Sequence, residues 1–295
     1  MAMLEGKAAL VTGASSGIGR ATAMALGREG AIVYATARRP EALTDLKAAS
    51  IQTLALDVSD EGSMVEAVRA VEAERGAIHT LVNNAGYIQS GVLEEVPLHA
   101  VRAEFEVNVF GMLRMSQLVL PAMRKRGEGR IVNVGSMGGL FTAPGAGAYH
   151  MSKYAVEALT DALRYEVRSF GVDVVLIQPT GVRTAFADTK TARIPEQEGP
   201  FAAFSKNYNA VVDNLYAESA RGIVSAADVA KAIVDAAKAS SPRTRYKVGL
   251  VAHALPVMRR LLTDRLWDAA MARQFPMTSR ETQAPTVELD HSIKE

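Results

Sequence analysis

The 295-residue sequence contains no cysteine, which excludes disulfides, thiolate metal sites and cysteine nucleophiles. It also has little net charge, because 33 lysine and arginine residues oppose 32 acidic residues, and this excludes a global field that would attract nucleic acid. No apolar run reaches the roughly 18 residues of a membrane-spanning helix, and a strand begins where a cleavable signal peptide would lie. We therefore expect a soluble, cytoplasmic protein with no nucleic-acid partner and no membrane span.

Composition and periodicity favour an α/β fold. Hydrophobic residues make up 48% of the chain and charged residues 22%, the balance of a globular protein with a sizeable core. Short, continuously apolar runs predict seven strands, at Lys7–Val11, Ala31–Thr36, Gln52–Leu56, Ile78–Val82, Arg130–Val134, Val172–Gln178 and Arg245–Val248. Helical patterns alternate with them, at Gly17–Glu29, Glu41–Ala49, Glu61–Arg75, Ala100–Arg126, Ser152–Phe170 and Ala226–Ala239. We predict a doubly wound, Rossmann-like parallel sheet of seven strands with helices on both faces and ligands beyond the carboxyl ends of its strands.

A glycine-rich turn joins the first strand to the first helix, with the sequence Thr12-Gly13-Ala14-Ser15-Ser16-Gly17-Ile18-Gly19. Its glycines let the backbone turn tightly and approach a ligand closely, and the following helix offers free N–H groups to a pyrophosphate. An ordinary turn can contain glycines too, but the flanking strand and helix supply the context of a dinucleotide site.

The second strand is followed by Arg38 and Arg39, without the acidic residue that binds the ribose 2′-hydroxyl in many NAD sites. An arginine can hold a 2′-phosphate through paired, charge-assisted hydrogen bonds, so we predict NADP as the cofactor. The alternative is a pair of solvated arginines at a strand end. Asp57, which follows the third strand, has the position either to bind the adenine amino group or to act only as a turn residue.

Tyr149 and Lys153 lie four residues apart in a segment with helical character, which brings their side chains to one helical face. A neighbouring cation lowers the pKa of a phenol from its usual value of about 10, so we expect Tyr149 to act as a general acid or base near neutral pH. Ser136 follows the fifth strand. With the glycine-rich turn, these residues indicate hydride transfer between a nicotinamide cofactor and a carbonyl or alcohol.

Residues 4–184 resemble the short-chain dehydrogenase/reductase family in the order and spacing of these motifs. The glycine-rich turn matches the family's cofactor motif, and Asn83-Asn84-Ala85-Gly86 matches its structural motif. The family's catalytic tetrad is matched by Asn108, Ser136, Tyr149 and Lys153.

The resemblance implies a role for each member of the tetrad. Tyr149 exchanges a proton with the substrate oxygen, while Ser136 hydrogen-bonds that oxygen as it gains charge. Lys153 holds the ribose hydroxyls and stabilises the phenolate. Asn108 kinks its helix and anchors a water that relays the proton. The cofactor supplies the hydride, so no metal is required.

The resemblance also implies a cofactor-binding set that extends along the carboxyl edge of the sheet. One departure follows the sixth strand, where the family usually has Pro-Gly and this chain has Thr180 between Pro179 and Gly181. A threonine there is expected to tighten the backbone beside the nicotinamide. The implied cofactor-binding residues are Thr12, Gly13, Ser15, Gly17, Ile18, Gly19, Arg38, Arg39, Asp57, Val58, Asn84, Ala85, Gly86, Tyr149, Lys153, Pro179, Gly181 and Thr184.

Three regions complete the predicted organisation. Residues 1–250 form the dinucleotide-binding and catalytic domain and include a substrate lid at 185–225, where Phe186, Phe201, Phe204 and Tyr208 favour a bulky hydrophobic ketone or alcohol. The same aromatic residues would serve equally as ordinary core. Residues 251–277 form a C-terminal extension in which Pro256–Arg273 is predicted as one helix, and residues 278–295 form a loose polar tail. Val134–Gly139 and this extension resemble the branch that contains hydroxysteroid and retinol dehydrogenases.

Partners are predicted from two apolar helices. The helix Val107–Met123 is apolar almost all round, and the family pairs this helix across a two-fold axis, so we expect a homodimer or homotetramer. Pro256–Arg273 carries arginines beside an apolar face, a pattern of a lid or interface helix that also allows peripheral membrane contact. A redox-sensing regulatory protein that binds NADP without turnover is the alternative function.

Overall fold

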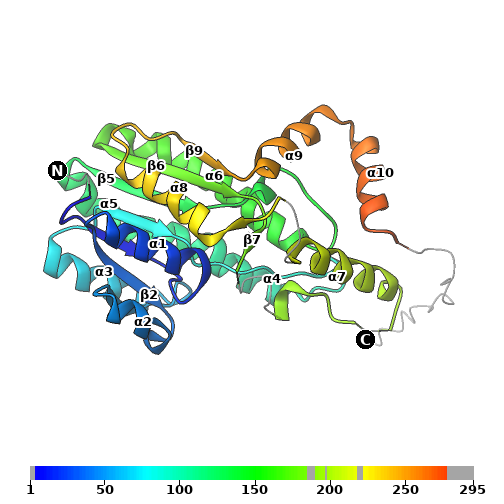
Figure 1. Ribbon diagram of the computed structural model, residues 1–295, viewed down its shortest axis with the longest axis horizontal. Helices are drawn as coiled ribbons and strands as arrows, with labels where there is room; N and C mark the ends of the chain where they lie inside the picture. The colour runs from blue at the N-terminus through cyan, green and yellow to red at the C-terminus, as the bar shows by residue number, and fades with distance from the viewer. Residues whose placement is uncertain (1–3, 185–189, 197, 218–221, 278–295) are drawn as a thin grey trace, which may run out of the picture.

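The computed structural model describes residues 4–184, 190–196, 198–217 and 222–277, and its centre is a parallel sheet (Figure 1). The strands lie in the order β3-β2-β1-β4-β5-β6-β9, and every neighbouring pair is parallel. The predicted doubly wound, seven-stranded sheet is confirmed. Its strands are β1 (Ala8–Val11), β2 (Ile32–Ala37), β3 (Gln52–Ala55), β4 (Thr80–Asn83), β5 (Gly129–Val134), β6 (Val172–Pro179) and β9 (Arg245–Val248).

Helices cover both faces of this sheet because successive strand side chains point to opposite sides. The main helices are α1 (Gly17–Arg28), α2 (Thr44–Ala48), α3 (Glu61–Arg75), α4 (Leu98–Phe105), α5 (Met112–Arg126), α6 (Gly147–Val167) and α8 (Ala226–Lys238). Val11 and Val132 pack on one face with α1 and α8, whereas Leu10 and Ile131 pack on the other face with α3, α5 and α6. Since β1 is flanked by β2 and β4, the strand order reverses there, and the crevice at this point is where such folds bind ligands.

The predicted helix Ala100–Arg126 is interrupted by a π-helical turn. This turn, η2 (Glu106–Gly111), lies between α4 and α5 and contains Asn108. At Gly111 a side chain would overlap the carbonyl oxygen of Val58, so the backbones are in close contact where the turn widens the helix. The expected distortion of the helix at Asn108 is therefore present as a π turn.

The predicted single helix Pro256–Arg273 is wrong, because the structure has two helices, α9 (Leu250–Leu261) and α10 (Asp264–Gln274). Thr263 has the extended backbone of an N-cap residue and Asp264 supplies the acidic first turn, so a new helix begins there. Arg259 holds the corner through an ion pair to Asp264 (2.6 Å) and by lying over the ring of Trp267, 5.5 Å from its centroid.

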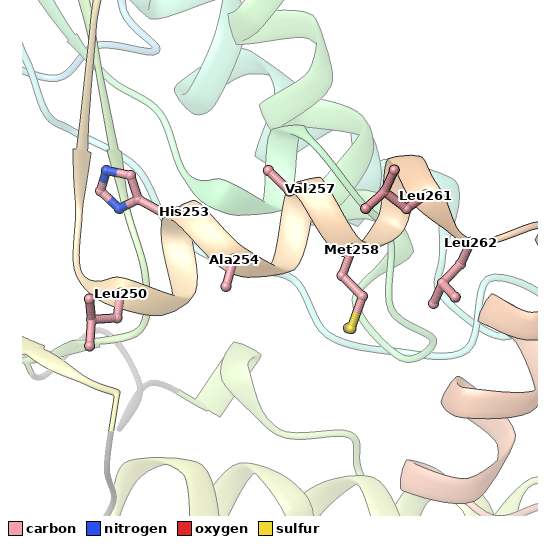
Figure 2. A pocket seen from close by; sticks show the side chains of 7 residues that line it. All are labelled: Leu250, His253, Ala254, Val257, Met258, Leu261 and Leu262. Carbon is pink, nitrogen blue, oxygen red and sulfur yellow. The ribbon is translucent and has the colours of Figure 1, made fainter.

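Helix α9 also exposes apolar side chains, and a shallow apolar groove runs along it (Figure 2). Leu250 is 86% exposed and Leu261 80% exposed. Within the described part of the chain, no helix has both the length and the apolar character needed to cross a membrane. The groove is lined by Leu250, His253, Ala254, Val257, Met258, Leu261 and Leu262.

The segment predicted as a lid, 185–225, contains α7 (Ala202–Tyr216) and β8 (Val224–Ser225). Strand β8 pairs in parallel with β7 (Val182–Arg183), and the sequence did not suggest this pair. Phe204 and Tyr208 are buried with Phe275 of the C-terminal segment in a separate apolar cluster. These two aromatic side chains therefore serve as core, which was the alternative reading of the pattern. Phe186 and the predicted tail lie outside the described residues.

Candidate active site

The predicted site residues converge on the carboxyl edge of the sheet. Gly13 follows β1, Asn84 follows β4, Ser136 follows β5 and Thr180 follows β6. Because all these strands are parallel, their carboxyl ends lie along one edge. Helix α6 then carries Tyr149 and its neighbours on this same side, since it packs on the short turn Met137–Gly139 that follows Ser136.

The glycine-rich turn is fixed by the segment after β4. The Thr12 hydroxyl accepts hydrogen bonds from the backbone N–H groups of Asn84 and Ala85, each at 3.0 Å. The Asn84 amide donates back to the carbonyl oxygens of Thr12 (2.9 Å) and Gly13 (3.0 Å). A side chain at Gly13, whose φ is +67°, would come within 2.8 Å of the Ala85 Cα atom. The turn therefore requires glycine and presents the N-terminus of α1, which suits a pyrophosphate.

The segment after β6 lies on the other side of the glycine-rich turn. We call the turn, together with the segments after β4 and β6, the cradle. A side chain at Gly17 would lie 3.0 Å from the Thr184 Cγ2 atom, so Thr184 is beside the glycine-rich turn. Thr180 is buried, and its methyl group occupies the space that a side chain at Gly249 would need. The threonine that departs from the family pattern thus packs against the end of β9. Pro179 is the last residue of β6.

Arg38 and Arg39 are both exposed after β2. Arg38 lies near enough to Tyr87 for its charge to lower the pKa of that phenol, although burial raises the pKa overall. Neither guanidinium forms an ion pair with another described residue. The Asp57 carboxylate accepts hydrogen bonds from the Ser59 backbone N–H (2.9 Å) and hydroxyl (2.6 Å), which is the turn role that the sequence left open.

The remaining predicted cofactor residues are placed around this cradle. Ser15 is exposed in the turn, and Ile18 and Gly19 belong to the first turn of α1. Val58 is buried after β3, where its carbonyl oxygen lies against Gly111. Gly86 lies against Asn108, and Gly181 lies against Tyr216.

Three members of the predicted tetrad meet beyond the carboxyl end of β5. The Ser136 hydroxyl hydrogen-bonds the Tyr149 phenol, and it also accepts a hydrogen bond from the Gly138 backbone N–H (3.0 Å). The Lys153 ammonium lies 5.6 Å from the centroid of the Tyr149 ring and donates to the Val134 carbonyl oxygen (3.1 Å). The helical spacing of Tyr149 and Lys153 therefore does bring them together, since both lie in α6.

The expected lowering of the Tyr149 pKa is wrong for the protein by itself. Burial raises the pKa of Tyr149, and the hydrogen bond from Ser136 opposes this increase. Burial also lowers the pKa of Lys153 to about 8, so this ammonium is itself poorly stabilised. The sequence predicted which groups meet, but it gave no measure of how far they are removed from water.

Asn108 is fully buried in η2, and its side chain connects the segment after β4 with α6. Its side-chain oxygen accepts from the Tyr87 backbone N–H (3.0 Å), and its amide nitrogen donates to the Tyr87 carbonyl oxygen (2.9 Å) and to the Ser152 hydroxyl (3.1 Å). Asn83 has a comparable structural function, because it donates to the Asn133 side chain on the neighbouring strand (3.0 Å). The tetrad's asparagine thus ties the segment after β4 to α6.

His150 is structural. Its Nδ1 atom donates to the Gly138 carbonyl oxygen (2.8 Å), and its Nε2 atom accepts from the Ala143 backbone N–H (3.1 Å), so both ring nitrogens are used to hold the loop around Ser136. No cluster of three or more potential metal ligands occurs in the described ranges.

Two further side chains reach this site without having been predicted. Tyr216 of α7 is close enough to Tyr149 to raise its pKa, and its hydroxyl oxygen lies 3.8 Å from the position of a side chain at Gly181. Glu104 is fully buried beside Asn108. Its spacing of four residues before Asn108 on a helix was the signal that could have identified it.

Comparison with known proteins agrees with this geometry. The sequence model of the short chain dehydrogenase family matches residues 7–195. The chain is 36% identical over 267 residues to the uncharacterized oxidoreductase YbbO of Escherichia coli, covering 89% of this chain and 93% of that protein. It is 39% identical over 181 residues to a 3-ketodihydrosphingosine reductase of Bacteroides thetaiotaomicron, covering 61% of this chain and 66% of that protein.

Solved structures are similar over most of the chain. A short-chain dehydrogenase from Streptomyces avermitilis has a TM-score of 0.78 at 34% identity, covering 91% of this chain and 95% of that one. A short-chain dehydrogenase/reductase from Burkholderia phymatum in complex with NAD has a TM-score of 0.74 at 27% identity, covering 96% and 100%. A serine dehydrogenase complexed with NADP⁺ has a TM-score of 0.72 at 25% identity, covering 83% and 95%.

Proposed function

This chain belongs to the short-chain dehydrogenase family, and from that premise we propose that it is an NADP(H)-dependent oxidoreductase that interconverts a ketone or aldehyde with its alcohol. The observation that carries the proposal is the meeting of Ser136, Tyr149 and Lys153 at the edge of the sheet that also holds the glycine-rich turn. A protein that only sensed NADP would have no need of this arrangement.

The proposed mechanism assigns the proton to the protein and the hydride to the bound nicotinamide. In the reducing direction the Tyr149 phenol donates its proton to the substrate oxygen, and the Ser136 hydroxyl, already hydrogen-bonded to that phenol, donates to the same oxygen as it gains negative charge. The Lys153 ammonium beside the ring stabilises the phenolate that remains. Asn108 fixes α6 against the segment after β4, which keeps these groups in register.

The residues present fit a dinucleotide, and we assign it as NADP. The turn requires glycine where a pyrophosphate would approach, and Thr184 closes the other side. Two exposed arginines directly follow β2, where many NAD sites have an acidic residue. Arg38 is close enough to Tyr87 for its charge to lower the pKa of that phenol. The similar solved structures include complexes with NADP⁺ and with NAD, so the choice rests on these arginines.

The proposed substrate is a bulky hydrophobic carbonyl compound. Support comes from one relative, which is named a 3-ketodihydrosphingosine reductase, and from the exposed apolar side chains of the C-terminal region. Tyr216 adds a phenol near Tyr149 and Gly181, where it can contact a substrate.

An initial-rate screen tests the function. The wild-type protein is assayed with NADPH and with NADH against small aliphatic, aryl, steroid, retinoid and long-chain 3-keto-lipid carbonyls, and NADPH binding is measured by fluorescence. We expect turnover with NADPH and the larger carbonyls. Tight NADPH binding without turnover of any carbonyl, or of the matching alcohols with NADP⁺, would favour the regulatory alternative and contradict the proposal.

We also propose self-association through η2, α5 and α6. Phe110 is 50% exposed and Tyr165 75% exposed on these elements, which leaves apolar area available for a second copy. Sedimentation of the wild-type protein as a monomer at micromolar concentration would contradict this.

A further inference from the structure

One buried carboxyl group next to the tetrad has no role in the mechanism above. Glu104, on α4, has none of its surface exposed. Its Oε1 atom accepts from the Gln89 backbone N–H (3.1 Å) and lies 3.5 Å from the Asn108 amide nitrogen. Its Oε2 atom is also buried and has no hydrogen-bond partner within the described part of the chain. A buried acceptor without a partner costs free energy, so a purely structural role at this position would be better filled by an uncharged residue.

The Lys153 ammonium is a second buried ionisable group beside Glu104. Helix α4 packs against α6, and the Asn108 amide nitrogen that lies 3.5 Å from Glu104 also donates to the hydroxyl of Ser152 (3.1 Å), the residue before Lys153. Burial raises the pKa of Glu104 to about 7, which the Gln89 N–H and the Lys153 charge oppose. Burial lowers the pKa of Lys153 to about 8, and the charge of Glu104 opposes that decrease. The other titratable groups that sense Glu104 are Tyr149 of α6 and Tyr87 after β4, and the negative charge raises the pKa of both phenols.

We propose that Glu104 is a positioning residue whose carboxylate supplies the negative charge that keeps the Lys153 ammonium protonated beside Tyr149. The inference rests on the proposed function, because Lys153 is taken there as the cation that stabilises the phenolate. A carboxylate in the second layer of the site can support a buried ammonium without occupying the space of substrate or cofactor, because charge interactions reach further in an interior that excludes water.

The first test does not use activity. Melting temperatures of wild type, Glu104→Gln, Lys153→Met and the double variant are measured at about pH 7.5 and pH 5 without cofactor. Glutamine keeps an acceptor for the Gln89 N–H and removes only the charge. At the higher pH, we expect Glu104→Gln to change the melting temperature more favourably in the Lys153→Met background than in the wild-type background by about 2–4 °C, because in the wild-type protein the substitution also removes the attraction between the carboxylate and the Lys153 ammonium. At pH 5 Glu104 is protonated, so the difference should vanish. Equal effects in both backgrounds at pH 7.5 would overturn the proposal.

The second test is the pH dependence of kcat/KM for carbonyl reduction. Without the Glu104 charge Lys153 loses its proton at a lower pH, so the alkaline limb should move toward neutrality. When each kcat/KM value is divided by the value of the same variant at pH 6.5, we expect Glu104→Gln to be roughly three- to ten-fold less active than wild type at pH 8.5. Glu104→Asp, which keeps the charge, should retain most of the wild-type profile. Glu106→Gln is the matched control, because Glu106 is exposed on the neighbouring turn.

A loss of activity by the same factor at every pH would mean that Glu104 is only structural, and would overturn the proposal. An inactive wild-type protein would instead contradict the proposed function, and the coupling measured by melting temperature would still decide whether Glu104 and Lys153 form a charge pair. The two failures are therefore distinguishable.

Discussion

The amino and carboxyl ends of the central sheet both contain buried ionisable side chains, yet their surroundings differ. At the amino end, Arg130 is buried at the start of β5 and donates to the carbonyl oxygens of Ala236 and Ala239 at the end of α8, and it pairs with Asp173 at 3.0 Å. Close by, the His79 Nε2 atom lies 3.0 Å from the Lys7 ammonium. These groups fasten strands and helices together, and the Arg130 and Lys7 charges each have a carboxylate in direct contact, although the Arg130 Nε atom has no hydrogen-bond partner among the described residues.

At the carboxyl end the interactions are incomplete. Lys153 has a single hydrogen bond to a described residue, at the Val134 carbonyl oxygen, and one oxygen of Glu104 has none. This end therefore leaves donors, acceptors and charge that described residues do not fill, which is the arrangement expected of a ligand site. The difference teaches that neither burial nor one unfilled hydrogen bond identifies a functional group in this fold, since the Arg130 Nε atom is also unfilled. What separates the two ends is that Arg130 has an opposite charge in direct contact, whereas no ion pair joins Lys153 or Glu104 to another described residue.

The largest effect is expected at the carboxyl end of the sheet, where Tyr149→Phe should remove activity but not stability. Removing the phenol oxygen removes the proton donor, so kcat/KM should fall by about 10²–10⁴-fold while NADPH affinity stays within a few-fold of wild type. Steady-state kinetics and fluorescence titration measure the two quantities. The melting temperature should be almost unchanged, and activity within a few-fold of wild type would remove Tyr149 from the mechanism.

Arg130→Met tests the amino end of the sheet, where we expect a loss of stability but not of activity. It leaves two buried carbonyl oxygens without their donor, so the free energy of unfolding should fall by about 2–4 kcal/mol while kcat/KM of the folded enzyme stays within about two-fold. Urea denaturation checks the first value. The control is Arg126→Met, which breaks a largely exposed pair to Glu128 and should cost less than about 1 kcal/mol. Equal losses in the two variants would contradict the comparison.

Arg38→Asp returns to the carboxyl end. If Arg38 holds the 2′-phosphate, the preference of kcat/KM for NADPH over NADH should fall by roughly ten- to a hundred-fold or reverse, because the contact is lost and a repulsive charge is added. Arg39→Asp is the matched variant. A preference lost only in Arg39→Asp would move the phosphate contact by one residue, and equal use of both cofactors by the wild type would refute it.

The smallest effect concerns the pH dependence of stability at His79. Burial, with the neighbouring Lys7 charge, lowers the pKa of His79 to about 4, so the unfolded chain takes up a proton before the folded one does. The resulting stability is present above about pH 6.5 and is lost as the pH falls, amounting to about 1–2 kcal/mol between pH 7 and pH 5. In urea unfolding series, His79→Gln should reduce this slope, with the remainder partly due to His150, whose pKa is also lowered by burial. His99→Gln, at an exposed position, is the matched control substitution.

Much of the fold could be predicted because its signals are local. Continuous apolar runs determine buried parallel strands, and the order of the motifs placed Ser136, Tyr149 and Lys153 at one edge of the sheet. What could not be predicted depends on contacts between distant segments. The burial of Phe204 and Tyr208 against Phe275 results from packing between α7 and the C-terminal segment, which periodicity does not encode. The pKa of Tyr149 depends on burial and was missed for the same reason. The break after Leu261 has a local signal in Thr263 and Asp264, but the apolar pattern that continues across it hid that signal.

The π-helical turn η2 has a consequence for how this chain can change. A π turn contains one residue more than the α-helical path needs, and the extra residue is absorbed as a local widening of the helix. Deleting a single residue between Glu106 and Gly111 would therefore let α4 and α5 join as one continuous α-helix, with the buried stripe of Met115 and Val119 still facing the sheet. The position of Asn108 would be lost, because the widened turn is what brings its side chain to Tyr87 and Ser152. A deletion in this turn should therefore harm the site more than the stability of the fold.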